Sequence, residues 1–331
     1  MGLATPLAVT QLLIGTLILF WGSEWLVRGS ATLARTLGVK SLVIGLTVVA
    51  YGTSAPELAV STEAATGHLT PVALGNVIGS CAANISLILG LTALIAPPTV
   101  DSRIIKREVP VLLLSVVAIP VTLYDGVISR TEGLVLVGCA VVFTIVTLTI
   151  SAGHDAPEDY VGLAERSETA AASYGGGRKA PGGSRLLALV MSGFGVLLLV
   201  VGSSQFVAGA RQLAGAWGVS ERMLGMTIVA LGTSMPELLA SILAALRGEG
   251  SLAVGSVIGS NLLNVFLVLG VVAYLHPVRV GERMHVVDAI GLGAITLLAV
   301  VFLRGHRKVS RVEGAILVVA YIAFMITAGI F

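Results

Sequence analysis

The feature that most constrains this chain is a carboxylate that occurs twice inside stretches apolar enough to cross a bilayer. Residues 45–58 read GLTVVAYGTSAPEL, and residues 225–238 read GMTIVALGTSMPEL. Each copy places an acid, Glu57 or Glu237, among apolar residues. A charge at membrane depth is costly and usually marks an ion or substrate path. Two related copies also indicate one site built from two halves, an arrangement found in many secondary transporters.

The composition indicates an integral membrane protein. Of 331 residues, 56% are hydrophobic and 11% are charged, and the mean hydropathy is +0.97. Soluble domains contain about 25% charged residues. The partner expected on this basis is the lipid bilayer; no basic run indicates nucleic acid, and no obligatory protein partner is evident. Cys81 and Cys139 lie in apolar stretches and are interpreted as core residues rather than a disulfide.

The apolar segments predict an all-α membrane protein with ten transmembrane helices. About 20 residues suffice to span a bilayer as a helix. The predicted helices cover residues 7–36, 41–66, 72–96, 104–123, 131–151, 185–215, 221–247, 251–274, 284–304 and 310–331. The first has neither a basic n-region nor a cleavage site, so we expect it to be retained rather than removed as a signal peptide. Residues 152–184 are rich in Gly, Ala, Ser and charge and predict a flexible linker.

The repeat extends well beyond the opening motif. Residues 22–45 align with 202–225, and GNVIGSCAAN at 75–84 aligns with GSVIGSNLLN at 255–264, both at an offset of 180. Near the ends, SRTEG at 129–133 matches SRVEG at 310–314. The chain therefore divides into a five-helix repeat at 1–151, the linker at 152–184, and a second five-helix repeat at 185–331. An odd number of helices per repeat makes the second half enter the membrane from the opposite side, so two inverted repeats are expected.

The basic residues predict the orientation. If loops are assigned alternately to the two sides, the side that holds the linker collects all of the 20 Lys and Arg residues except Arg130, Arg211, Arg222, Arg279 and Arg283. Basic residues concentrate on the cytoplasmic side. We therefore expect a prokaryotic plasma-membrane protein with a cytoplasmic linker and both termini outside.

The first motif carries a helix breaker beside its acid. Pro56 lacks an N–H and clashes with the carbonyl four residues earlier, so the helix should kink or break there. In lipid, backbone freed in this way must find a partner or line a cavity, which makes the carbonyls at 50–52 candidate oxygen ligands. Thr53, Ser54 and Glu57 share one helical face. The second copy supplies the equivalent set Ala230, Thr233, Ser234, Pro236 and Glu237.

The following helix of each half adds more oxygen donors. Ser80 and Asn84 are four residues apart, as are Ser260 and Asn264. Nearby glycines, at 75 and 79 and again at 255 and 259, allow close helix approach or local unwinding. Carboxylate, hydroxyl, amide and carbonyl oxygens suit hard cations such as Ca²⁺ and Na⁺ better than softer metals. No resident cofactor is indicated.

Each of these features has a structural explanation of its own. Proline in a membrane helix usually only kinks it, and Ser, Thr and small residues usually serve helix packing. The combination of an acid, a proline and two hydroxyls, present twice, favours a binding site. The five histidines lie in loops or at helix ends, and we expect them to be solvated.

These residues resemble the sodium/calcium exchanger family, within the cation/calcium antiporters. The resemblance covers the whole chain and rests on GTSAPE with GNVIGS and on GTSMPE with GSVIGS. It implies ten helices in two inverted repeats, with ion sites at mid-membrane. Carried over position by position, it implies Ca²⁺ and Na⁺ coordination by these residues: Glu57, Glu237, Thr53, Ser54, Thr233, Ser234, Ser80, Ser260, Asn84, Asn264, and the carbonyls of Ala50 and Ala230.

Position 264 departs from the family pattern. Many relatives have an acid at one or both of the positions of Asn84 and Asn264, whereas this chain has amides at both. Two carboxylates still neutralise one Ca²⁺, but K⁺ co-transport becomes less favoured. The linker is also too short for the large Ca²⁺-sensing domains of some animal exchangers.

The function expected from these residues is exchange of Ca²⁺ for Na⁺ by alternating access. The alternative is exchange of Ca²⁺, or another divalent cation, for H⁺ on the same scaffold, because a buried glutamate can carry protons. An enzyme is not expected, since no nucleophile–base pair or hydrolytic metal motif is found. A channel is disfavoured because the acids form a two-fold site rather than a ring around a pore.

Overall fold

The protein is helical throughout almost all of the chain that the computed structural model describes, which is residues 4–36, 50–100, 104–152, 185–246, 248, 250–279, 284–305 and 308–330. The α-helices of the first half are α1 (Ala4–Thr36), α3 (Ala50–Thr53), α4 (Ala55–Thr66), α5 (Thr70–Ala82), α6 (Leu89–Ile95), α7 (Val109–Thr122) and α8 (Arg130–Ala152). Those of the second half are α10 (Arg185–Trp217), α11 (Glu221–Leu224), α12 (Ala230–Thr233), α13 (Met235–Leu246), α14 (Gly250–Leu263), α15 (Gly270–Leu275), α16 (Met284–Gly305) and α17 (Arg311–Ile330).

Short π-helical turns connect several of these helices into longer segments. They are η2 (Ala83–Ile88), η3 (Ile104–Glu108), η4 (Gly225–Val229) and η5 (Asn264–Leu269). Within the described residues, seven helical segments are long and apolar enough to cross a membrane, or eight if the bent segment from Glu221 to Leu246 counts as one span. Helix occupies most of the described residues in each of the ten predicted ranges. The predicted linker, 152–184, lies outside the described residues apart from Ala152, which ends α8.

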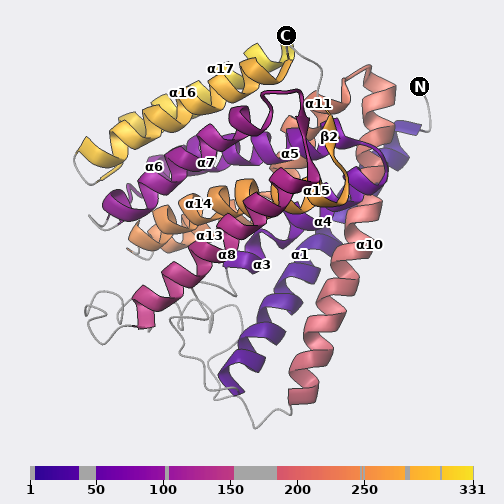
Figure 1. Cartoon of the computed structure of the whole chain (residues 1–331), viewed down its shortest axis with the longest axis horizontal. Coiled ribbons are helices and arrows are strands. Elements are labelled where there is room, and N and C mark those ends of the chain that lie inside the picture. The colour runs from indigo at the N-terminus through magenta and orange to yellow at the C-terminus, as the bar shows by residue number, and fades with distance from the viewer. Residues whose placement is uncertain are drawn as a thin grey trace.

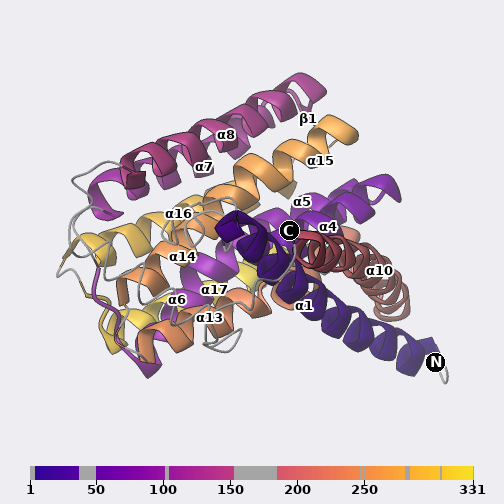
Figure 2. The same ribbon diagram turned by 90° about the horizontal axis from the view of Figure 1, so that it is seen from below.

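The longest helices, α1 and α10, pack against each other along one side of the molecule (Figures 1 and 2). Glycines seven residues apart form the contact: Gly15, Gly22 and Gly29 on α1, and Gly195, Gly202 and Gly209 on α10. A Cβ at Gly15 would lie 2.7 Å from the Phe206 nitrogen, and one at Gly29 would lie 2.5 Å from the Ser192 nitrogen. Later residues of α1 thus face earlier residues of α10, so the first helix of each half runs antiparallel to its counterpart.

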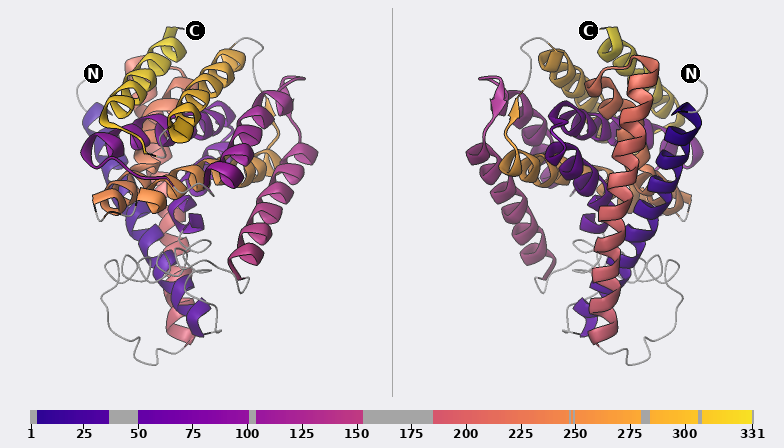
Figure 3. Two further views of the ribbon diagram at one scale, coloured as in Figure 1. Left: turned by 90° about the vertical axis from the view of Figure 1, so that its left-hand side faces the viewer. Right: turned by 90° about the vertical axis from the view of Figure 1, so that its right-hand side faces the viewer.

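Two backbone pairings between the halves are also counterparts of each other. Strand β1 (Val127–Ile128) of the first half pairs antiparallel with β2 (Val278–Arg279) of the second, and a single bridge joins Thr99 to Lys308. Thr99 corresponds to Arg279 at the offset of 180, and Val127 corresponds to Lys308 at the offset of 181 that relates SRTEG to SRVEG, so the bridge from Thr99 to Lys308 is the counterpart of the pair of Val127 and Arg279. The start of α1 and the end of α17 lie at the same end of the molecule (Figure 3).

One buried ion pair has no counterpart in the other half. Arg222 in α11 donates from Nη1 to both carboxylate oxygens of Asp288 in α16, each at 2.6 Å, and from Nη2 to the carbonyl of Ala328 in α17. Both charged side chains are almost inaccessible to solvent. The sequence places Arg222 among the loop charges, but the structure buries it; position 42, its equivalent, is leucine. Three helices of the second half are therefore joined at this point.

Candidate ion-binding site

Each motif breaks its helix one residue after its threonine. Helix α3 ends at Thr53 and α4 begins at Ala55; α12 ends at Thr233 and α13 begins at Met235. The second break bends the segment by 45°. The prolines at 56 and 236 account for the breaks, because neither can donate to the carbonyl four residues before it. The predicted interruption is thus present in both halves, and each glutamate lies in the first turn after it.

Glu57 and Glu237 are both buried, each with about 1% of its surface exposed. The hydroxyl of Ser234, from the second half, donates to Oε1 of Glu57 at 3.0 Å. Conversely, Thr53 of the first half hydrogen-bonds to the Glu237 carboxylate. Ser260 donates to Oε1 of Glu237 at 3.5 Å, a long contact. Each carboxylate is therefore held by the other half, although helical spacing alone places Thr53 and Ser54 on the same face as Glu57.

The second oxygen of each carboxylate has no hydrogen-bond partner among the described residues. The same is true of the Ser54 hydroxyl and of both amide atoms of Asn84 and Asn264, all of them buried. Asn84 lies in η2, which packs against α13, and Asn264 begins η5, which packs against α4. Buried polar atoms normally have partners. Hard oxygen donors gathered in this way fit a cation such as Ca²⁺ or Na⁺.

The candidate carbonyls differ in their availability. The carbonyl of Gly52, which Pro56 frees, accepts a hydrogen bond from the Ser23 hydroxyl of α1. The carbonyl of Ala230 accepts from the backbone N–H of Ser234 at 3.0 Å and from the Thr233 hydroxyl at 3.3 Å. Ala50 begins α3. One of the three carbonyls at 50–52 is thus satisfied by α1, which links the first helix directly to the break.

Comparison with known proteins identifies the family. The model of the sodium/calcium exchanger protein family matches residues 7–149 and, separately, residues 187–329. The chain belongs to the sodium/calcium exchanger family. Family members are ion transporters, and the apolar helices make this one a transmembrane protein. The two matches begin 180 residues apart, as the motifs do.

Two relatives and a solved structure match this family member over almost their whole length. It is 37% identical over 320 residues to the putative antiporter CaxA of Alkalimonas amylolytica, covering 96% of this chain and 97% of the relative. It is 33% identical to the sodium/calcium exchanger MaX1 of Methanosarcina acetivorans, covering 95% and 96%. A solved structure of the sodium-calcium exchanger NCX_Mj matches with a TM-score of 0.66 at 33% identity, covering 98% of this chain and 99% of the other.

Asn76 is a site residue that the sequence analysis did not single out. Its Oδ1 accepts from the hydroxyls of Thr233 at 3.3 Å and Ser80 at 3.4 Å, and its Nδ2 donates to Ser61 at 2.9 Å. This buried amide orients two predicted ligands, one from each half. A polar amide between Gly75 and Gly79 in an apolar helix was the available signal.

The glycines beside the site bring two segments close together in the first half. A Cβ at Gly79 would lie 2.4 Å from the Met226 carbonyl oxygen, and one at Gly75 would lie 2.6 Å from that of Arg222. The predicted close approach therefore holds in the first half. In the second half, a Cβ at Gly255 meets only the tip of Ile104, at 3.9 Å, and one at Gly259 meets none of the described residues within 4 Å. The counterparts of Arg222 and Met226, residues 42 and 46, lie outside the described residues, so close approach at Gly255 and Gly259 stays a prediction.

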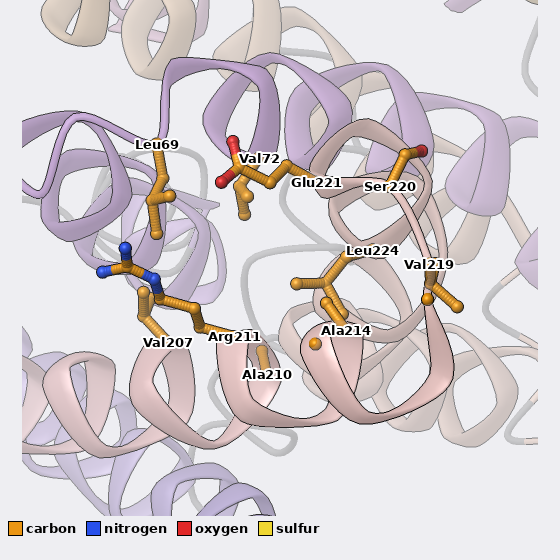
Figure 4. A pocket seen from close by; sticks show the side chains of 12 residues that line it. Leu69, Val72, Val207, Ala210, Arg211, Ala214, Val219, Ser220, Glu221 and Leu224 are labelled. Carbon is orange, nitrogen blue, oxygen red and sulfur yellow. The ribbon is translucent and has the colours of Figure 1, made fainter.

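A cavity of about 520 Å³ lies apart from these residues, where α10 and α11 meet the α4–α5 corner (Figure 4). Arg211 and Glu221 place one charge of each sign in its wall. None of the twelve predicted ligands lines it. Its lining residues are Leu69, Val72, Val207, Ala210, Arg211, Ala214, Gly215, Gly218, Val219, Ser220, Glu221 and Leu224.

Proposed function

We propose that this family member exchanges Ca²⁺ for Na⁺ at a site centred on Glu57 and Glu237. The observation that carries the proposal is the buried oxygen set: among the described residues, each carboxylate keeps one oxygen without a partner, and η2 and η5 supply unpartnered amide oxygens nearby. Two carboxylates neutralise one Ca²⁺ or attract several Na⁺ ions. The names of the relatives MaX1 and NCX_Mj support the choice of these two ions.

The ligand set that we propose comprises Glu57, Glu237, Thr53, Ser54, Thr233, Ser234, Ser80, Ser260, Asn84, Asn264 and the carbonyls of Ala50 and Ala230. Hydroxyls that cross between the halves support it, because they place both carboxylates at one location. Competition of Na⁺ and Ca²⁺ for the same oxygens supplies the coupling, since occupancy by one ion excludes the other.

We further propose that the two halves are inverted repeats that give alternating access. The antiparallel packing of α1 on α10 and the reciprocal strand pairings support this arrangement. In the proposed topology, the β1–β2 face is external, both termini are outside, and 152–184 is cytoplasmic. The basic-residue distribution supports that orientation.

Exchange for H⁺ is the second candidate. Its support is the complete burial of both carboxylates beside hydroxyl donors, a setting in which a proton can replace a cation. The deciding experiment measures ⁴⁵Ca²⁺ uptake into proteoliposomes driven in turn by an outward Na⁺ gradient and an outward H⁺ gradient. Saturable uptake driven by the Na⁺ gradient alone supports the proposal. Uptake driven by the H⁺ gradient alone would identify H⁺ as the coupling ion.

The site assignment is tested in the same assay with Glu57→Gln and Glu237→Gln. At an effective dielectric constant of about 20, unit charges 4 Å apart interact by about 4 kcal/mol. Losing one carboxylate should therefore weaken Ca²⁺ binding at least about a hundredfold and nearly abolish flux. Glu63→Gln, farther along α4 and only half-buried, is the matched control and should transport normally. Normal flux in either site variant would reject the assignment.

A further inference from the structure

Two histidines that the sequence analysis treats as solvated residues lie together on the face that carries the β1–β2 ribbon. His68 occupies the corner between α4 and α5, and His276 follows the last residue of α15, two positions before β2. Their ring centroids are 6.0 Å apart and their planes are nearly perpendicular, at 84°. The two residues come from opposite halves, so only the folded chain brings them together.

The backbone conformation of His68 favours a functional role for its side chain. His68 has a φ of +62°, in the left-handed region, and no other non-glycine residue in the described ranges has a positive φ. A non-glycine residue there costs energy and is often found at ligand sites. The equivalent corner of the second half has Gly248, with a φ of +80°. Glycine thus provides the same left-handed backbone conformation at the corner that has no imidazole.

The separation of the rings suits a shared metal ion. A tetrahedral Zn²⁺ about 2.1 Å from each ligating nitrogen lies roughly 3 Å from each ring centroid, which places the two centroids about 5 Å apart. Side-chain rotation of the exposed His68 and the half-exposed His276 can close the remaining distance. Imidazole prefers Zn²⁺, Cu²⁺ and Ni²⁺ to Ca²⁺, so the pair would select against the hard cations that fit the carboxylate site.

We propose that His68 and His276 form a two-histidine site for a borderline transition-metal ion such as Zn²⁺ or Cu²⁺. The described residues contain no group of three or more His, Cys, Asp or Glu side chains that could hold a metal, so water fills the remaining coordination positions. A bound ion joins the corner after α4, the helix of Glu57, to the end of α15, which continues from the η5 turn of Asn264. Those helices already pack together, and the ion crosslinks them at the surface.

The test uses the full-length protein, purified with its affinity tag removed. Zn²⁺ binding is measured by calorimetry, and the electron paramagnetic resonance spectrum of bound Cu²⁺ reports nitrogen ligands. His68→Asn is the suitable variant because asparagine tolerates a positive φ; His276→Asn is its partner. Each should weaken Zn²⁺ binding more than about tenfold, since even outer-shell substitutions cost roughly 10–100-fold in metal affinity. The spectroscopic signature of two nitrogen ligands to Cu²⁺ should disappear in the same variants.

Two controls separate this site from the carboxylates. The double variant Glu57→Gln/Glu237→Gln should keep full Zn²⁺ binding and the nitrogen signal, and His154→Asn, in the predicted linker, should be unchanged. Zn²⁺ binding that survives in either His68→Asn or His276→Asn overturns the proposal. Binding lost in the glutamine variant but kept in the histidine variants overturns it as well, by assigning the ion to the carboxylate site.

Discussion

At the scale of single residues, the site is held together by hydroxyls and amides that reach across from the other half. Ser234 binds Glu57, and Thr53 binds Glu237. Asn76 joins Ser80 of one half to Thr233 of the other. These bonds orient side chains whose remaining oxygens face a cation in the proposed function. The second-half residue equivalent to Asn76 is Ser256, so the network is not symmetric.

Replacing Asn76 should therefore weaken ion binding even though Asn76 is not a proposed ligand. Asn76→Ala removes the acceptor for the buried Ser80 hydroxyl and one of the two acceptors of the Thr233 hydroxyl, at a cost of about 1–3 kcal/mol. We expect apparent Na⁺ and Ca²⁺ affinities to fall about tenfold, as measured by flux against ion concentration. Ser256→Ala is the matched control, with little expected effect. Equal kinetics for the two variants would show that the Asn76 network does not orient the ligands.

Spacing along the chain predicts the members of the site but not their pairings. The i, i+4 pattern groups Thr53 with Glu57 on one helical face, yet the structure brings Thr53 to Glu237. Helical periodicity describes one helix, whereas these partners depend on how the two halves approach each other. The occupied carbonyl of Gly52 was unpredictable for the same reason, because Ser23 reaches it from α1.

At the scale of elements, glycine determines how closely two segments pack. Helix α5 lies against η4 at Gly79, where a Cβ would meet the Met226 carbonyl at 2.4 Å and the Ala230 Cβ at 2.8 Å. The sequence predicts close approach at four motif glycines, and the structure shows it at two. The repeated motif thus reproduces the backbone break in both halves, and the close packing beside it is seen at the first copy.

Gly79→Ala should be damaging and Gly138→Ala, at an exposed position of α8, should not. The methyl group at position 79 collides with backbone, which cannot rotate away, and overpacking of this kind costs about 1–3 kcal/mol. We expect a lower apparent melting temperature in detergent and slower exchange. At position 138 the methyl group meets none of the described residues within 4 Å, and helix propensity favours alanine. A damaging Gly138→Ala would mean that this face of α8 meets another segment during transport.

Loss of one partner from the buried pair of Arg222 and Asp288 should strongly destabilise the second half. Arg222→Ala leaves a buried carboxylate unpaired, which costs about 3–5 kcal/mol. The double variant Arg222→Met/Asp288→Leu should recover most of the melting temperature, because apolar replacements for buried pairs are often neutral. Arg28→Ala is the control: its pair with Glu24 is half exposed and is worth at most about 1 kcal/mol. Similar losses of melting temperature for Arg222→Ala and Arg28→Ala would contradict the burial of the pair of Arg222 and Asp288.

At the scale of the whole molecule, the long-range organisation could be predicted from the sequence to a large extent. The 180-residue offset between motifs reappears in the two family matches and in the paired helix breaks, and with the slip to 181 near the ends it relates the contact of β1 with β2 to that of Thr99 with Lys308. The length of the apolar segments and the spacing of the repeated motifs indicate such features directly. The ion pair at Arg222 could not be foreseen, since its partners lie 66 and 106 residues away.

The proposed topology predicts opposite accessibility for two introduced cysteines in a cysteine-free version of the chain. Tyr124 is 94% exposed on the β1 face, so Tyr124→Cys should react with a membrane-impermeant maleimide in intact cells. Ser173→Cys, in the linker, should react only after lysis. The reverse pattern would invert the orientation and the direction of Ca²⁺ movement, and labelling of both in intact cells would reject the ten-helix assignment.

The crossed hydroxyl–carboxylate pairs have a consequence for biosynthesis. A ribosome delivers the first half to the membrane well before Ser234 has been translated, so Glu57 enters the bilayer before the hydroxyl that binds it exists. The nascent first half therefore carries an acid without its partner, which makes it a substrate for membrane quality control until residues 185–331 follow. A stop codon in the linker should yield a short-lived fragment, and supplying the missing half as a separate polypeptide should prolong its lifetime.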